Sequence, residues 1–153
     1  MAIVCRMEKN CVLSDFLQLE QTGGHVFQNP CLLEQAMTHP SFLHENSENK
    51  GRDYQRLEFL GDAILGMLLA EMLYLRYPNW EEGALSQLRS RLAGQDVLAD
   101  RARHIGLGEH ILLGRGEEQS AGHDKDSILS DVLEALIAAI YLDSGLDLSL
   151  IHI

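Results

Sequence analysis

The sequence predicts an all-α fold, and three observations support this prediction. The chain has 153 residues, a hydrophobic content of 46% and only three prolines. Long stretches lack the glycine pairs and turn clusters that separate short strands. Apolar residues instead recur at the three- and four-residue spacing of amphipathic helices. The length suits one well-buried core rather than two ordinary domains, so we expect a single domain.

The first part of the chain is expected to form two short helices and a loop. Apolar spacing predicts a helix over residues 11–20, which the glycines that follow should end. Asn29-Pro30 is a typical N-cap and first-turn pair, so a second helix should run over residues 30–38 until Pro40 ends it. The polar segment 43–52 is expected to be a loop.

The longest helical pattern covers residues 53–77 and is expected to be the central helix of a bundle. It contains Gly61 and Gly66, and Pro78 ends it.

Two further helices are expected in the second half. One amphipathic helix should run over residues 81–104, with its leucines inward and most of its arginines outward. The segment 106–126, which contains glycine and mixed charge, should mainly be a connection. A final helix is expected over 128–142, closed by Ser144-Gly145.

The charge of the chain argues against a basic nucleic-acid-binding surface. The formal net charge is -11, which is the wrong sign for neutralising phosphates. Residues 106–153 hold nine acidic residues against only Arg115 and Lys125. A polyanion could still approach if divalent cations offset these acids.

Cysteine usage and hydropathy indicate a cytoplasmic protein with no membrane partner. Cys5, Cys11 and Cys31 are odd in number and have no CxxC spacing, which is typical of a reducing compartment. No apolar run reaches the length of a membrane span, and the first twelve residues lack the core of a secretory signal. The glycines of 106–116 follow no predicted strand, so a nucleotide cofactor is not expected either.

Two pairs of acids lie in apolar surroundings. Glu58 and Asp62 are four residues apart on the long helix, so their side chains project from one face. Asp131 and Glu134 are the only acids of the last helical pattern, three residues apart among Ile, Leu, Val and Ala. Burial of neighbouring carboxylates is costly unless a positive charge neutralises them.

Hard divalent cations supply such a charge, because Mg²⁺ prefers carboxylate oxygens, water and phosphate oxygens. The sequence therefore allows a Mg²⁺ or Mn²⁺ centre, which is suited to phosphodiester hydrolysis. The alternative interpretation is a pair of solvated acidic helix faces, which is the usual role of such residues. The pattern alone leaves both interpretations open and does not name a substrate.

Two motifs carry a resemblance to a known family. Residues 55–65 (QRLEFLGDAIL) and 127–137 (SILSDVLEALI) resemble the two catalytic motifs of ribonuclease III. Shorter supporting stretches are Thr38-His39-Pro40-Ser41-Phe42, Glu82-Gly83 and residues 112–117. Together they cover roughly residues 12 to 147 in the family's order. The resemblance implies the ribonuclease III endonuclease domain fold over residues 11–149, after an N-terminal extension of residues 1–10.

The resemblance also implies an activity and a site. Glu58, Asp62, Asp131 and Glu134 would hold the catalytic metal, with Asp62 and Glu134 closest to the chemistry. Members of the family cut double-stranded RNA as homodimers, with one site per subunit, and leave 5′-phosphates and short 3′ overhangs. Processing of ribosomal and other RNA precursors is the expected role. A non-cleaving RNA-binding protein or an oligomerising fragment of the same fold is the alternative, although none of the four acids is lost.

A dimer receives some support from the residues themselves. Phe59, Ala63, Gly66 and Ala70 fall on one side of the long helix, where a partner helix could approach closely. Internal packing explains this pattern equally well. In the family, the residue that matches Phe59 inserts into the other subunit.

Departures from the family pattern concern two positions and the C-terminus. Many relatives have glutamate where Gln55 stands, at a position linked to substrate handling, and Glu82 matches another acid of this secondary kind. Residues 150–153 do not continue the family pattern, so the chain is expected either to be a fragment, truncated in this tail, or to carry an unnatural terminus. The basic double-stranded-RNA-binding domain usual in bacterial relatives is absent, and weak RNA binding is therefore expected. His39 is expected to cap or pack rather than to catalyse.

Overall fold

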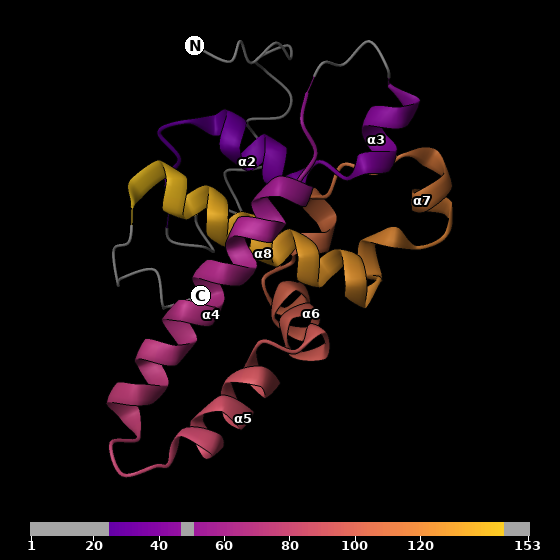
Figure 1. Ribbon diagram of the computed structural model, residues 1–153. Helices are drawn as coiled ribbons and strands as arrows, with labels where there is room; N and C mark the ends of the chain where they lie inside the picture. The colour runs from indigo at the N-terminus through magenta and orange to yellow at the C-terminus, as the bar shows by residue number, and fades with distance from the viewer. Residues whose placement is uncertain (1–24, 47–50, 146–153) are drawn as a thin grey trace.

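The computed structural model describes residues 25–46 and 51–145 (Figure 1). Its α-helices are α2 (Pro30–Met37), α3 (Pro40–Glu45), α4 (Gln55–Arg76), α5 (Glu82–Leu92), α6 (Gln95–His104), α7 (Arg115–Gln119) and α8 (Asp126–Ser144), and its 3-10 helices are η1 (Leu107–His110) and η2 (Gly122–Asp124). Within these residues, β-structure is limited to one isolated bridge between Thr38 and Leu112. The all-α prediction is confirmed. The helix expected over 11–20 lies outside the described residues.

The long helix α4 has nearly the bounds that the sequence predicts, but α8 is the more deeply buried helix. Ten residues of α8 are buried, against four of α4. Helices α2, α4 and α6 all pack against α8, and Figure 1 shows α4 crossing in front of it. Beyond this crossing, α4 and α5 form a hairpin that extends away from the other helices (Figure 1). The core is therefore built around α8.

The predicted single helix over 81–104 is wrong, because the chain breaks it at Ala93-Gly94. α5 ends at Leu92, and Gly94 adopts an extended conformation as the N-cap of α6. Glycine disfavours a helix interior. The break lets α6 turn onto α8 and bury Leu98 along with its neighbouring alanines.

The loop predicted over 43–52 is also wrong in its first residues. Pro40 follows the end of α2, but it is also the first residue of α3. His39 is the N-cap of α3, and its side chain accepts a hydrogen bond from the Ser41 amide. Proline suits this position because the first helical residue needs no amide donor. The capping role expected for His39 is confirmed.

The segment 106–126 is more structured than the connection that the sequence predicts, because η1, α7 and η2 lie within it. The amide of Leu112 donates to Met37 and its carbonyl accepts from the His39 amide, at 2.8 and 3.0 Å. The final helix is confirmed, and Gly145 ends it with a positive φ of 80°. No described helix is both long and apolar enough to span a bilayer.

Candidate metal centre between α4 and α8

The two acid pairs meet where α4 and α8 cross, and a glycine makes this crossing possible. Gly61 lies on α4 between Glu58 and Asp62, and it is buried against α8. A Cβ atom at Gly61 would lie 1.9 Å from the backbone oxygen of Glu134. Only a residue without a side chain allows the helices to approach this closely.

Three of the four predicted ligands form a compact group. Glu58, Asp131 and Glu134 each offer a carboxylate oxygen, and these oxygens all lie within 4.8 Å of one another. All three residues are partly buried. Asp62 is exposed and does not belong to this group. The structure therefore brings together one acid of α4 and two acids of α8, and the fourth acid, Asp62, lies at the exposed rim of this group.

Burial and mutual repulsion raise the pKa values of the grouped acids. Glu134 is affected most: burial, followed by the charges of Asp62, Asp131 and Glu58, raises its pKa to about 7. Burial also raises the pKa of Glu58, and the nearby acids add to this effect. For Asp131, burial raises the pKa although the hydroxyl groups of Ser130 and Tyr54 oppose the rise. Asp62 is thus close enough to act on Glu134 electrostatically.

In the described part of the chain, no side-chain cation forms an ion pair with these acids, and only a weak electrostatic effect of His39 on Asp131 opposes their repulsion. The ion pairs found among residues 25–46 and 51–145 involve other acids, namely Glu117, Glu118, Asp124, Asp126 and Asp143. Three close carboxylates without a basic partner match the all-oxygen ligand set of Mg²⁺ or Mn²⁺. The residues present therefore fit a hard divalent cation.

Tyr54 links the start of α4 to the acidic group. Its side chain is buried, and the nearby Asp131 carboxylate acts on it electrostatically. Burial, together with the charges of Asp131 and Glu58, raises the pKa of Tyr54. The phenol is therefore neutral at ordinary pH values.

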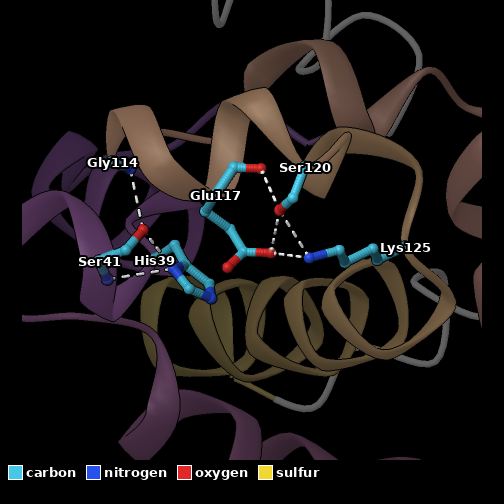
Figure 2. A network of polar contacts seen from close by, with 6 residues as sticks. All are labelled: His39, Ser41, Gly114, Glu117, Ser120 and Lys125. Carbon is cyan, nitrogen blue, oxygen red and sulfur yellow. Dashed lines mark hydrogen bonds and ion pairs between the residues drawn. The ribbon is translucent and has the colours of Figure 1, made fainter.

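A polar network includes His39, which lies near enough to Asp131 to feel its charge (Figure 2). The Ser41 hydroxyl lies 2.7 Å from Nδ1 of His39 and accepts a hydrogen bond from the Gly114 amide at 2.9 Å. Burial lowers the pKa of His39, although the charges of Glu117 and Asp131 oppose this shift. His39 is therefore a mainly neutral ring fixed to the α3–α7 contact.

Glu117 and Lys125 form the other half of this network (Figure 2). The Lys125 ammonium pairs with the Glu117 carboxylate and donates to the Ser120 hydroxyl at 2.8 Å. The hydrogen bond from Lys125 lowers the pKa of Glu117. Glu117 lies in α7 and Lys125 is at the N-cap position of α8, so this ion pair joins α7 to the start of α8.

The two secondary candidates, Gln55 and Glu82, lie outside the carboxylate group. Both side chains are exposed. Glu82 is in the first turn of α5, where its carboxylate accepts a hydrogen bond from the Ser86 hydroxyl at 2.6 Å. This contact and the favourable position at a helix N-terminus account for Glu82 locally.

Several large apolar side chains of α4 are exposed to solvent. Phe59 is 82% exposed, and Met67, Tyr74 and Leu75 are exposed on the same helix. Internal packing therefore does not explain Phe59. Large exposed apolar patches are typical of protein–protein contacts.

The raised pKa of Glu134 makes a testable contribution to stability. Glu134 has a pKa of about 7 in the folded protein and an ordinary pKa of 4.5 in the unfolded chain. Between pH 4.5 and pH 7, the folded protein therefore binds more protons at this residue than the unfolded chain does. Without metal, its contribution to stability is therefore present below pH 4.5 and is lost as the pH rises to about 7.

We expect the melting temperature in EDTA to decrease less steeply over this range in Glu134→Gln than in the wild type. Differential scanning calorimetry at several pH values measures this difference. Parallel curves for the two proteins would contradict the shift.

Two residues of the site were missed by the sequence analysis. Gly61 was treated only as an interruption of a helical pattern, and Tyr54 was not singled out. The position of Gly61 between Glu58 and Asp62 is the one feature of the sequence that could have predicted a close helix crossing at the acids. No sequence signal connected Tyr54 to Asp131, which is far from it in the chain.

The fold and the site define an all-helical domain whose two longest described helices cross at an acidic centre suited to a divalent cation. Residues 29–149 match the family described as Ribonuclease-III-like. The chain belongs to this family.

Individual relatives agree with this assignment. A ribonuclease 3 from Geobacter metallireducens is 46% identical over 140 residues, which cover 91% of this chain and 57% of the relative. One from Azotobacter vinelandii is 50% identical over 130 residues, covering 85% and 54%. The chain thus spans about half the length of these curated relatives.

Solved structures show the same fold. The nuclease domain of ribonuclease III from Campylobacter jejuni has a TM-score of 0.79 and 41% identity, covering 85% of this chain and 87% of that chain. That domain has structural flexibility in a region involved in dimer formation. Dicer from Pichia stipitis has a TM-score of 0.57 and 26% identity, covering 80% of this chain and 49% of that chain.

Proposed function

We propose that this chain is the catalytic domain of a metal-dependent endoribonuclease that cuts both strands of double-stranded RNA as a homodimer. The observation that carries the proposal is the group of Glu58, Asp131 and Glu134, which fits a hard cation, in a chain related to ribonuclease III nuclease domains. The proposed products have 5′-phosphate and 3′-hydroxyl ends with short 3′ overhangs. Ribosomal and other RNA precursors are the proposed substrates.

The proposed ligands of Mg²⁺, or of Mn²⁺ in its place, are the three grouped acids together with Asp62. When bound, such a cation activates water for attack on phosphorus and stabilises the charge on the leaving oxygen. Glu58 and the two acids of α8 supply carboxylate oxygens from two helices, and Gly61 allows these helices to lie close together. Asp62 is exposed and has the largest effect of the neighbouring acids on the pKa of Glu134, so it can meet water or substrate at the rim.

Glu134 has a second task in this proposal, because its proton must leave when a cation binds. With a pKa of about 7, the Glu134 carboxyl is protonated in about half of the metal-free molecules at neutral pH. Cation binding therefore releases a proton and strengthens as the pH rises. The same cation reduces the repulsion between the acidic surface and the RNA backbone.

The exposed apolar face of α4 is the proposed dimer interface, with Phe59 as its main anchor. Aromatic anchors contribute about 2 kcal/mol or more when truncated at an interface. We expect Phe59→Ala to weaken self-association by about 30-fold or more, which sedimentation equilibrium measures.

The matched control is Val26→Ala, because Val26 is 75% exposed and precedes α2 rather than lying on α4. It should leave the association constant unchanged. An unaltered association constant in Phe59→Ala would assign the interface to another surface.

The direct test is cleavage of a long end-labelled RNA duplex at low salt, with Mg²⁺ and with EDTA, resolved on a denaturing gel. Mg²⁺-dependent fragments with 5′-phosphate ends support the proposal. Intact duplex after incubation with a folded dimer and Mg²⁺ would instead indicate a non-cleaving protein of the same fold, and fragments that persist in EDTA would exclude the metal.

A further inference from the structure

We propose that Arg103 is a positioning residue that fixes the start of α8 and, through this helix, the two metal ligands that α8 carries. This inference rests on the metal centre proposed above. Arg103 lies in the last turn of α6. Its Nε donates to the Asp124 carboxylate at 2.5 Å, and its Nη2 donates to the Asp126 carboxylate at 2.5 Å and to the Asp124 carbonyl at 2.6 Å. One guanidinium therefore binds both acids that flank the N-cap of α8.

The start of α8 has no side-chain cap of its own. Its N-cap residue is Lys125, whose side chain makes no capping hydrogen bond. The usual N-cap residues are Ser, Thr, Asp and Asn, whose oxygen accepts from an amide of the first turn. Asp126 complements the positive end of the helix dipole, but this attraction does not fix where the helix end lies in the fold. The position of this helix end therefore depends on contacts with other helices.

Glu117 and Ser120 hold the same helix end from another side (Figure 2). Lys125 has an extended backbone, with φ -73° and ψ 127°, and successive side chains of an extended chain point to opposite sides. Its ammonium therefore bonds to the Glu117 carboxylate and the Ser120 hydroxyl, while the carboxylates of its two neighbours bond to the guanidinium of α6. The alternating charges of residues 124–126 thus hold the start of α8 to both α6 and α7.

The guanidinium defines the position of α8 more narrowly than the apolar contact between α6 and α8 does. α6 buries a leucine and two alanines, and hydrophobic contact is not directional. Hydrogen bonds are directional, and the donors of Arg103 form a rigid planar fork. Exposed ion pairs usually contribute little to stability, but an arginine with several good hydrogen bonds in a charge network is an exception. Arg103 is such a residue.

A shift of the start of α8 would move the metal ligands on this helix. Asp131 and Glu134 follow Asp126 by five and eight residues, which corresponds to roughly 8 and 12 Å along a rigid helix. Their carboxylate oxygens lie within 4.8 Å of one another and of an oxygen of Glu58, which belongs to α4. Displacement of α8 relative to α4 would therefore change the geometry of this group.

The test is Mn²⁺ binding by isothermal titration calorimetry, without RNA, to the wild type and to Arg103→Gln. Loss of a group that directly holds a metal ligand weakens binding by about 10- to 100-fold. Because Arg103 acts through the helix rather than on a ligand, we expect the Kd for Mn²⁺ to rise by a smaller factor, about three- to tenfold. Arg103→Lys keeps the charge but not the fork, so its Kd should lie between those of Arg103→Gln and the wild type.

The matched control is Arg101→Gln. Arg101 is an exposed residue of the same helix and forms no ion pair among residues 25–46 and 51–145. Its replacement should leave the Kd unchanged. Asp126→Asn provides a second variant, and combining it with Arg103→Gln should weaken Mn²⁺ binding by less than the product of the two single effects, because both remove the same contact.

A merely structural role for Arg103 would give a different result. It would lower the melting temperature in EDTA and leave the Kd of the folded protein for Mn²⁺ unchanged. Equal Kd values for Arg103→Gln and the wild type, equal weakening in Arg101→Gln, or full multiplicativity in the double variant would overturn the inference. Absence of Mn²⁺ binding by the wild type would instead overturn the metal centre itself.

Discussion

Replacement of Glu134 by glutamine is expected to reduce metal-dependent cleavage of duplex RNA by more than about 100-fold, because loss of a ligand should exceed the effect of losing a residue that only orients one. The amide keeps the shape of the side chain and removes its charge. Single-turnover cleavage with Mg²⁺ measures the effect.

The same substitution should not destabilise the metal-free protein. Glu134 is partly buried near three other acids, and burial, followed by the charges of these acids, raises its pKa to about 7. Removal of this charge relieves repulsion, so at pH 8 in EDTA the variant should melt at or above the temperature of the wild type. The combination of lost cleavage and retained stability separates a ligand from a packing residue.

The control for this prediction is Glu118→Gln, because Glu118 is an exposed acid on α7 whose carboxylate lies 3.9 Å from the His123 ring, away from the three grouped acids. It should cleave like the wild type. Wild-type cleavage by Glu134→Gln would exclude Glu134 as a ligand, and equal losses in both variants would point to a general effect of charge.

Replacement of Gly61 by alanine is expected to have the largest effect on stability. The added Cβ would lie 1.9 Å from the Glu134 carbonyl oxygen, so α4 and α8 must separate. Overpacking of this kind costs about 1–3 kcal/mol or more, and a backbone neighbour cannot relax as a side chain can. The better helix propensity of alanine offsets only about 1 kcal/mol of this cost.

Separation of the helices should also remove the metal site, since Glu58 and Glu134 lie on opposite sides of the crossing. Urea denaturation and Mn²⁺ titration of Gly61→Ala measure the two effects. Gly83→Ala is the matched control, because Gly83 lies in α5 with no atom within 4 Å of an added Cβ. If Gly61→Ala unfolds at the same urea concentration as Gly83→Ala, the close crossing is not required.

The predicted elements that failed share one physical cause. Ala93-Gly94 and Pro40 were each compatible with more than one local structure, because a glycine can interrupt a helix and a proline can end one helix or begin another. Packing decided between these possibilities. α6 buries Leu98 and its alanines against α8, and α3 is capped by His39 and held against α7.

The positions of the acids were predicted better than the bounds of these elements, but the prediction did not distinguish the acids by burial. Spacing predicted that Glu58 and Asp62 share a face of α4 and that Asp131 and Glu134 share a face of α8. It did not predict which acid would remain at the rim. Asp62 is exposed while Glu58 is partly buried, a difference that depends on how α4 packs in the fold rather than on spacing.

By itself, the sequence determined the helical class, the approximate bounds of the two helices that carry the acids, and the family to which these motifs belong. These properties follow from periodicity and from motifs that are local in the chain. Only the tertiary structure decided that Gly61 allows the helices to cross, that Tyr54 is buried near Asp131, and that Phe59 faces solvent. Each of these depends on residues far apart in sequence, or on what a surface packs against, which local spacing does not encode.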